Sequence, residues 1–327
     1  MMGFFKKIKK TNLRYCYTNL VFFLTNDIQK EIIKEKNRTI KELKFLLNNH
    51  ELDLLYLKIL DYFNNNSNVN NYKEEIAFLR ENGRINVYPY KCVENNNLKI
   101  ISGKDLEKGG MPYVLHNDKR LYFPIEWTEE QAVEKYKILI DTENILGINS
   151  RNKSPHQYVT NDFKVNTGDV LLDLGAAEGL FALNYVDIAA KIYIFEPLTF
   201  WREPLLATFE PYKEKVEIVN KYVSNIDDEY NVKLGSWIAK INNDSVFIKM
   251  DIEGFETKVL KDNLEFFKNL KGLKISCCTY HKHDDDVICE NLLKEIGLKT
   301  CFSDGYMLFI YDELKPPYFR KGILRGY

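Results

Sequence analysis

The sequence predicts an α/β protein: a doubly wound, mostly parallel sheet of seven strands, preceded by a helical and partly β N-terminal region. Three observations predict it. From about Thr167 onward, short and nearly continuous apolar runs alternate with helical patterns, which is typical of strands covered by helices on both faces. Several of these runs end directly in a polar residue. Two short runs near the C-terminus flank the turn signal Asp304-Gly305, which predicts a terminal hairpin.

The N-terminal part, residues 1–150, is expected to be an accessory region, and residues 151–327 the main domain. Apolar residues recur at helical spacing between Asn26 and Phe63, and an Asn-rich break follows. A helix over Lys73–Glu81 ends near Gly83. Later segments are short and rich in β-branched and aromatic residues, which predicts a small β region over Ile85–Tyr90, Leu98–Ser102, Tyr113–His116 and Leu121–Pro124. A helix from Glu129 to about Ile140 leads into the main domain.

The main domain alternates predicted strands with predicted helices. The expected strands are Val170–Leu174, Lys191–Phe195, Val216–Tyr222, Ser245–Met250 and Leu273–Thr279, with Lys299–Ser303 and Met307–Tyr311 as the hairpin. The expected helices are Glu178–Ala190, Phe200–Glu210, Phe255–Phe267 and Asp285–Ile296. This order indicates βαβ units and hence a parallel sheet.

Charge and cysteine usage limit the function classes. The 327 residues carry a net charge of −1, so no overall field attracts nucleic acid. None of the six cysteines forms a C-x-x-C pair, which favours free thiols in a reducing cytoplasm. The basic run Lys6–Lys10 and the apolar run Leu20–Leu24 resemble a signal peptide only loosely, and the apolar run is too short to span a bilayer. We therefore expect a cytoplasmic protein with no transmembrane segment and no nucleic-acid partner.

A glycine loop follows the first predicted strand as Asp173-Leu-Gly175-Ala-Ala-Glu-Gly179. Glu196 ends the next strand, 23 residues (196 − 173) after Asp173, near the offset of an acid that binds ribose hydroxyls. The loop lacks the G-x-G-x-x-G pattern that cradles a pyrophosphate, and the Asp173 carboxylate would repel one. The pattern favours an adenosine-containing ligand with a cationic part, such as S-adenosylmethionine (SAM). An ordinary tight strand-to-helix turn is the alternative.

Further polar residues follow the fourth and fifth strands. Asp251-Ile-Glu253-Gly254 follows the fourth, and His281 comes soon after the fifth. Ligands of open parallel sheets bind outside the carboxyl ends of the strands. We therefore expect Asp173, Glu196, Asp251 and His281 to converge at one edge of the sheet.

Three motifs carry a resemblance to a known family: Asp173-Leu-Gly175, Phe195-Glu196-Pro197, and the block Lys249-Met-Asp251-Ile-Glu253-Gly with its flanking residues. The chain resembles, over about residues 154–311, the FkbM family of class I methyltransferases, in particular a subset found with bacterial surface-polysaccharide genes. The resemblance implies a Rossmann-like methyltransferase sheet. It also implies SAM-dependent O-methylation of a sugar hydroxyl, on a nucleotide-activated, capsular or other surface saccharide. The chain departs from the family at Ala177-Glu178 and at Leu234-Gly235-Ser236.

The expected cofactor residues lie in the glycine loop and after the second, third and fourth strands. They are Asp173, Gly175, Ala176, Glu178, Gly179, Glu196, Pro197, Val223, Ser224 and Asp251. Glu196 is expected to accept hydrogen bonds from the ribose hydroxyls. Gly175 and Gly179 are expected to let the backbone approach the cofactor. Asp173 is expected to lie under the methionine part, directly or by ordering the loop, and Ser224 to contact adenine or to cap a turn.

Methylation of a sugar hydroxyl calls for a base or a metal. His281 is the first candidate base, with an ordinary structural histidine as the alternative. Asp251 and Glu253 are expected to orient His281, to bind acceptor hydroxyls, or to hold Mg²⁺ together with it. His156 and Tyr158 are expected to close over the site, or else to form a polar linker turn.

Two other functions stay open. An NAD-dependent oxidoreductase would need a Tyr/Lys or comparable set for hydride chemistry, which the sequence does not display. A non-catalytic SAM-binding interaction protein would use the helical N-terminal part for contacts, homodimerisation among them.

Overall fold

The computed structural model describes residues 50–327 except 92–98, 150–152, 240, 242–244 and 311–313. The chain divides into two compact units, Met1–Asn64 and Asn65–Tyr327. The described part of the first unit is helical, and the helices predicted before residue 50 lie outside the described residues, as do the Lys6–Lys10 and Leu20–Leu24 runs. The second unit contains the sheet together with residues 65–150, and the accessory role expected for residues 1–150 remains a prediction. Among the described helices, none is long and apolar enough to cross a membrane.

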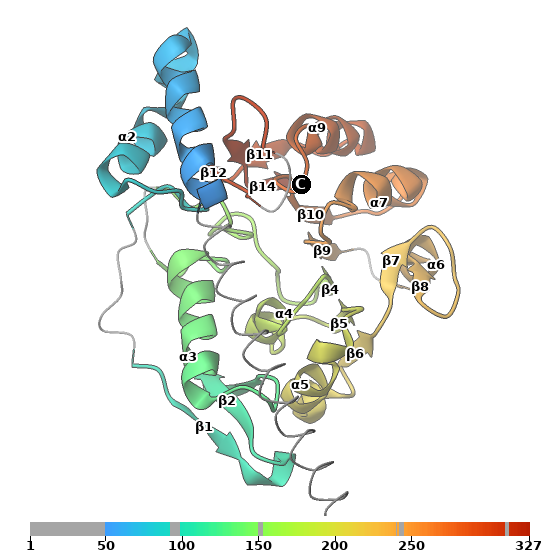
Figure 1. The fold of residues 1–327 in the computed structure, drawn as a ribbon. Coiled ribbons are helices and arrows are strands. Elements are labelled where there is room, and N and C mark those ends of the chain that lie inside the picture. The colour runs from blue at the N-terminus through green and yellow to red at the C-terminus, as the bar shows by residue number, and fades with distance from the viewer. Residues whose placement is uncertain (1–49, 92–98, 150–152, 240, 242–244, 311–313) are drawn as a thin grey trace, which may run out of the picture. The chain divides into compact units, whose positions relative to one another are not determined.

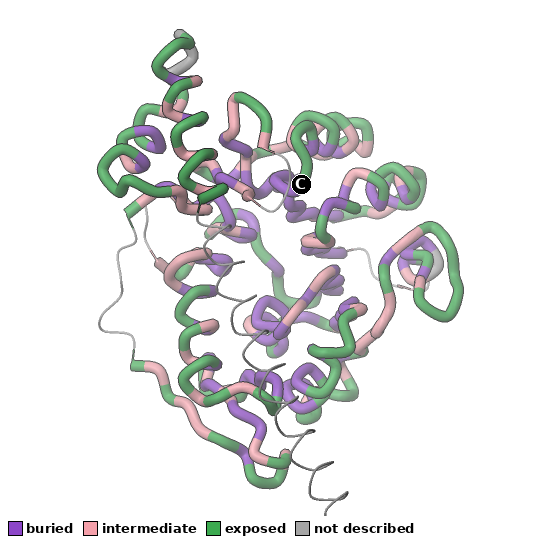
Figure 2. The backbone as a smooth tube through the Cα atoms, in the orientation of Figure 1, coloured by how far each residue is buried: buried purple, intermediate pink, exposed green. Residues whose placement is uncertain are grey.

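A seven-stranded sheet forms the centre of the second unit (Figure 1). Its order is β11 (Thr300–Phe302), β14 (Ile323–Gly326), β10 (Leu273–Cys278), β9 (Val246–Met250), β4 (Val170–Leu174), β5 (Lys191–Phe195) and β6 (Val216–Val219). Neighbouring strands are parallel except that β14 runs antiparallel to both β10 and β11. Every residue of β4 and β9 is buried, as the continuous apolar runs predicted (Figure 2). The predicted fold class is confirmed.

The predicted terminal hairpin is wrong in its pairing. β11 pairs with β14 and not with the run that follows Asp304-Gly305. That run contributes β12 (Tyr306–Met307), which pairs with β13 (Arg320–Lys321) in a separate two-stranded sheet. The reason is burial: all four residues of β14 are buried, so this strand takes the place between β10 and β11. Arg325 interrupts the apolar pattern of β14, so the sequence does not show this strand as a continuous apolar run. The buried Arg325 side chain donates hydrogen bonds to the carbonyl oxygens of Gln157 and Tyr158.

Helices cover both faces of the sheet, which makes it doubly wound. One hydrophobic core contains Leu171 and residues of α3 (Glu129–Lys137), α4 (Leu180–Tyr185) and α5 (Thr199–Phe209). The other contains Leu172 and residues of four helices: α6 (Leu234–Ile238), α7 (Glu256–Asp262), α8 (Leu264–Lys268) and α9 (Asp285–Ile296). Adjacent strand residues enter different cores because side chains alternate across a strand. The single helix predicted over Phe255–Phe267 is divided into α7 and α8 at Asn263.

The segment before the sheet contributes smaller elements. It contains η1 (Ser67–Tyr72), α2 (Lys73–Asn82), and an antiparallel sheet of β1 (Ser102–Asp105), β2 (Met111–His116) and β3 (Lys119–Tyr122). Short turns are η2 (Leu106–Lys108), η3 (Ile138–Thr142) and η4 (Glu210–Tyr212), and β7 (Tyr222–Ser224) pairs with β8 (Asn231–Lys233). The α2 helix ends at a left-handed Gly83, as predicted. Residues 85–90 form no strand, and the strand predicted over Val216–Tyr222 stops at Val219, so these two predictions are wrong.

Candidate functional site

The strand order reverses at β4. From β4 the chain crosses over to β5 on one side, while β9 occupies the other side of β4. In open sheets this reversal leaves a crevice at the carboxyl ends of the strands, where ligands bind. Asp173 is the last residue but one of β4, Glu196 directly follows β5, and Asp251 directly follows β9. Three of the four residues predicted to converge therefore lie at the switch point, and His281 contacts Asp251 as described below.

The glycine loop is packed tightly against the end of β9. Gly175 has φ +73°, and a Cβ atom there would lie 1.7 Å from the carbonyl oxygen of Asp251. A Cβ on Gly179, which has φ +84°, would lie 2.8 Å from Leu205 and from Phe209 in α5. Both glycines therefore make room for protein atoms, whereas their approach to a cofactor remains a prediction.

Glu196 is held by backbone N–H groups from two sides. Its Oε2 accepts from Ala177 in the glycine loop and its Oε1 accepts from Leu198, each at 2.9 Å. Ala177 reaches this position with φ +47°, a strained conformation for alanine. The carboxylate is 4% exposed, and burial raises its pKa. Because each carboxylate oxygen has two lone pairs, both oxygens keep an acceptor site for a ligand hydroxyl.

Asp173 pairs with Lys249, a residue for which no role was predicted. The Nζ of Lys249 lies 3.2 Å from Oδ1 of Asp173 and also donates to the carbonyl oxygen of Gly175. Burial raises the pKa of Asp173, and the Lys249 ammonium opposes that effect. The bridge from β4 through β9 to Gly175 fixes the loop, which favours the indirect role predicted for Asp173. The sequence signal that could have indicated a role for Lys249 is a lysine inside the otherwise apolar strand β9.

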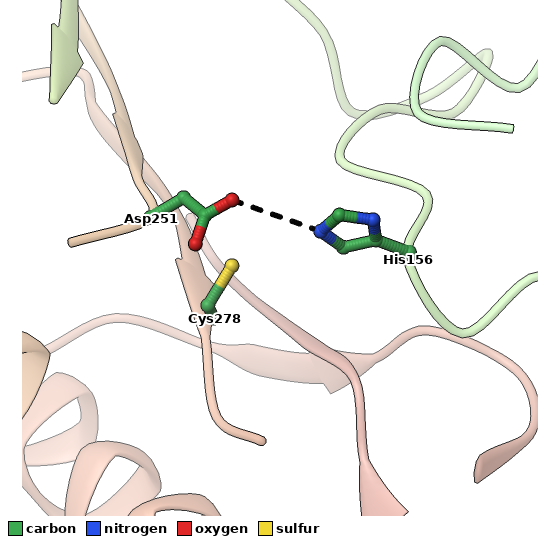
Figure 3. A group of neighbouring side chains, drawn as sticks. All are labelled: His156, Asp251 and Cys278. Carbon is green, nitrogen blue, oxygen red and sulfur yellow. Dashed lines mark ion pairs between the residues drawn. The ribbon is translucent and has the colours of Figure 1, made fainter. Parts of the chain in front are cut away.

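Asp251 faces a buried histidine that also contacts an acid on its far side. Nε2 of His156 lies 3.8 Å from Asp251 Oδ2 (Figure 3). On the other side of the ring, Nδ1 lies 3.2 Å from Glu143 Oε2. Burial alone would lower the pKa of His156, but Asp251 and Glu143 raise it to about 9. Burial would raise the pKa of Asp251, yet His156 and other nearby cations hold it well below its ordinary value. At neutral pH the three groups form a carboxylate–imidazolium–carboxylate series in which the ring is buried and both carboxylates are partly exposed.

Three tyrosine hydroxyls surround His156. Tyr158 Oη lies 2.9 Å from Nε2 and donates to Asp251 at 2.7 Å. Tyr280 Oη lies 3.1 Å from the same nitrogen, and Tyr88 Oη lies 3.1 Å from Nδ1. His156 and Tyr158 are 5% and 2% exposed. Both side chains are therefore buried beside Asp251, and closure of either over a bound ligand remains a prediction.

His281 lies among three carboxylates. Its Nδ1 is 2.9 Å from Glu256 Oε1, and its Nε2 is 3.4 Å from Asp251 Oδ1 and 3.6 Å from Glu253 Oε2. Glu256 is fully buried and also accepts the N–H of Ile252 at 2.9 Å. Burial alone would lower the pKa of His281, but Glu256, Asp251 and Glu253 together raise it. Glu256, which the sequence analysis assigned no role, therefore orients the ring, and Glu253 contributes an 85% exposed carboxylate beside Nε2.

Two side-chain groups among the described residues have metal-ligand spacing. The first is His156, Asp251 and Cys278 (Figure 3). It suits a metal poorly, because a ligand must be deprotonated and burial raises the pKa of the Cys278 thiol well above its usual value. The second is Asp251, Glu256 and His281, whose oxygen-rich donor set fits Mg²⁺ or Mn²⁺.

The remaining predicted cofactor residues lie near the loop or farther along the sheet edge. Glu178 and Ala176 are buried, and burial raises the pKa of Glu178 while the Lys135 ammonium opposes the effect. Val223 packs in a hydrophobic core. Ser224 Oγ exchanges hydrogen bonds with the backbone of Ile226 at 3.2 Å, the turn alternative foreseen for it. Contact of these side chains, or of the half-buried Pro197, with a ligand remains a prediction.

No family model and no curated protein matches the chain. Solved structures do. A precorrin-6Y C5,15-methyltransferase from Geobacter metallireducens aligns with a TM-score of 0.34 at 12% identity, covering 50% of this chain and 82% of that one. An rRNA methylase from Streptococcus thermophilus gives 0.31 and 12%, covering 50% and 87%. Magnesium protoporphyrin IX methyltransferase from Synechocystis, with SAM bound, gives 0.32 and 11%, covering 49% and 70%. Similarity at this level carries no conclusion about the activity of this chain.

Proposed function

We propose that the chain is a SAM-dependent methyltransferase whose donor site lies at the carboxyl ends of β4 and β5. The observation that carries the proposal is the Glu196 carboxylate, fixed by the N–H groups of Ala177 and Leu198 beside the glycine loop. An acid at this position beside the switch point is suited to accept both hydroxyls of an adenosine ribose. The loop does not have the three-glycine pattern of a pyrophosphate site, which disfavours the NAD-dependent alternative.

Donor binding can be measured directly on the purified chain. Isothermal titration calorimetry with SAM and with its demethylated product should detect binding. Glu196→Gln should weaken it at least tenfold, because the amide offers one acceptor oxygen in place of two charged ones. Glu217→Gln, an exposed position on the neighbouring strand β6, serves as the matched control. If calorimetry detects no binding of SAM or of its demethylated product, and mixing with the protein enhances NADH fluorescence, the chain would instead be assigned as an oxidoreductase.

We assign the general base to His281. The contact between Nδ1 and Glu256 places the ring proton on that side, so Nε2 can accept a proton from an acceptor hydroxyl. Bound SAM would supply an electrophilic methyl group. The acceptor oxygen would bond to the methyl carbon as the carbon–sulfur bond breaks, and the hydroxyl proton would pass to Nε2 of His281. Asp251, 3.4 Å from Nε2, stabilises the resulting imidazolium.

A metal-assisted variant has a specific observation in its favour. Nε2 of His281 lies 3.4 Å from Asp251 Oδ1 and 3.6 Å from Glu253 Oε2, so these three groups could bind one ion. Glu256, which also has ligand spacing with Asp251 and His281, contacts the opposite ring nitrogen and would serve as an outer carboxylate. Such an outer carboxylate commonly orients a metal-bound histidine. Mg²⁺ or Mn²⁺ held there would lower the pKa of the acceptor hydroxyl. Electron paramagnetic resonance of added Mn²⁺ tests this without an activity assay. Binding of Mn²⁺ that is lost in Glu253→Gln would support the metal-assisted variant. If Mn²⁺ stays unbound even at millimolar protein, the mechanism with His281 as base and no metal is retained.

The acceptor we propose is a sugar hydroxyl on a nucleotide-activated, capsular or other surface saccharide. Its support is the resemblance of the strand-end motifs to the FkbM family, together with a net charge of −1 that gives no general attraction to nucleic acid. Free, buried Cys277, Cys278 and Cys289 support a cytoplasmic location. SAM binding without methyl transfer to any saccharide would favour the non-catalytic interaction protein, for which homodimerisation is the first property to measure.

A further inference from the structure

A second concavity lies next to His281, outside the residues used above. Its volume is about 240 Å³. Aromatic rings of Tyr72, Tyr306, Tyr318 and Phe319 form one part of its lining, and charged groups of both signs form the rest. We call it the C-terminal pocket, because most of these residues belong to the segment from β12 to β13.

The aromatic part of the C-terminal pocket is held in place by ring contacts. Tyr72 stacks on Phe319 with centroids 5.2 Å apart and planes inclined by 26°, and its edge contacts Tyr306 at 4.8 Å. Tyr72 ends η1, so a residue from before the main sheet is fixed against the C-terminal segment. Rings of this kind offer an apolar face together with a polar hydroxyl edge, which suits a ligand that is itself apolar on one side and hydroxylated at its rim.

The charged side chains of the pocket favour a polyhydroxylated ligand over an apolar ligand or a phosphate. Asp284, Asp286, Lys315 and Lys321 all line it. An apolar ligand would desolvate these groups without replacing their hydrogen bonds. A phosphate would be attracted by Lys315 and Lys321, but it would leave the Asp284 and Asp286 carboxylates beside its own charge without a donor. A polyhydroxylated ring can donate to the carboxylates and accept from the ammonium groups at the same time.

The pocket is tied to the candidate base through Arg320. This buried side chain lines the pocket, and its Nη1 donates to the carbonyl oxygens of Tyr280 at 2.8 Å and His281 at 2.7 Å. His283, which also lines the pocket, follows His281 by two residues, so their Cα atoms are at most about 7 Å apart. The backbone of the candidate base therefore lies close to the lining of the pocket.

We propose that the C-terminal pocket binds the sugar unit adjacent to the one that is methylated, so that the acceptor is an oligosaccharide. The inference rests on the proposed function and specifies its substrate class. A volume of about 240 Å³ falls below the roughly 300–1,000 Å³ of sites for drug-sized ligands, which suits one sugar ring and excludes a whole nucleotide sugar.

The test uses the full chain with SAM present and an array of bacterial di-, tri- and tetrasaccharides beside their component monosaccharides. Wild-type protein should bind at least one oligosaccharide at least tenfold more tightly than its monosaccharides. Asp286→Asn and Tyr72→Leu should each remove most of that difference, while calorimetric affinity for SAM stays within twofold. Glu295→Gln, an exposed acid near the other end of α9, is the control for Asp286→Asn. Circular dichroism melts establish that each variant is folded.

The outcomes separate this inference from the proposed function. Failure to bind SAM removes the methyltransferase assignment itself. SAM binding with no array ligand, or with equal affinity for monosaccharides and oligosaccharides, overturns the pocket alone. Oligosaccharide selectivity that survives in both folded variants overturns it as well.

Discussion

The contact between Gly175 and the end of β9 makes a sharp prediction for Gly175→Ala. The new Cβ would lie 1.7 Å from the carbonyl oxygen of Asp251 and 2.8 Å from its carbonyl carbon. Since the atoms it meets belong to the backbone, the overlap can be relieved only by moving the glycine loop or the Asp251 peptide. Either movement displaces the carboxylate that contacts His156 and His281.

Two effects add up in this variant. Alanine at φ +73° costs about 1–2 kcal/mol relative to glycine. Overpacking of a well-packed site typically costs a further 1–3 kcal/mol or so. We therefore expect the free energy of unfolding to fall by about 2–5 kcal/mol, which a domain of ordinary stability, about 5–15 kcal/mol, can survive.

Gly168→Ala separates the two effects. Gly168 has φ +89°, and a Cβ there would meet no atom within 4 Å. This variant should show only the backbone strain, about 1–2 kcal/mol. The difference between the two variants then measures the overlap with Asp251.

Urea unfolding followed by the fluorescence of the three tryptophans gives both free energies. Calorimetry with SAM gives the consequence for the site: at least a tenfold loss of affinity in Gly175→Ala and little change in Gly168→Ala. Equal destabilisation by the two substitutions would refute the steric argument. Equal SAM affinity would refute the link between the loop and the donor site.

Three further predictions concern the histidines at the site. The pKa of His156 is raised from its ordinary value near 6.5 to about 9, so its positive charge stabilises the fold fully below about pH 6.5. Roughly 3 kcal/mol of this stabilisation is lost as the pH rises through 9. Urea unfolding midpoints of the wild type between pH 6 and 10 should show the loss, and an equally steep decline in His156→Asn would contradict it. Tyr158→Phe removes a hydroxyl that donates to Asp251, so it should lower the free energy of unfolding by about 1–3 kcal/mol in the same assay, and an unchanged midpoint would argue against that hydrogen bond. Glu256→Gln should lower the pKa of His281, which an NMR titration of the imidazole C–H signals measures, and an unmoved titration midpoint would remove Glu256 as the group that orients the ring.

The parallel part of the fold could be predicted because its strands are short, continuous apolar runs. The pattern over Val170–Leu174 matches β4 to the residue, since burial on both faces requires an apolar side chain at nearly every position. The last two strands are different. Whether Ile323–Gly326 or Met307–Tyr311 pairs with β11 depends on which strand the interior can bury, and a local turn signal at Asp304-Gly305 does not contain that information.

The site shows the same division between local and non-local information. Glu196 could be placed from its distance to the glycine loop, because the length of a βαβ unit fixes that spacing. Glu143 and Tyr88 could not, since they reach His156 from the segment before the main sheet. Glu256 stood within a recognised motif, but only the turn at Glu253, with φ +55°, brings it behind His281.

The buried charges at the switch point argue for function more than for stability. Replacing a buried ion pair with apolar groups is often neutral or stabilising, whereas removing one partner is strongly destabilising. Lys249→Met alone should therefore cost about 3–5 kcal/mol, because the fully buried Asp173 loses its cation. The double variant Asp173→Leu with Lys249→Met should recover most of that stability, yet it should not bind SAM, since the bridge to Gly175 is gone. A double variant that is as unstable as Lys249→Met would mean that the pair serves folding, and a stable one that binds SAM normally would mean that the pair does not order the donor loop.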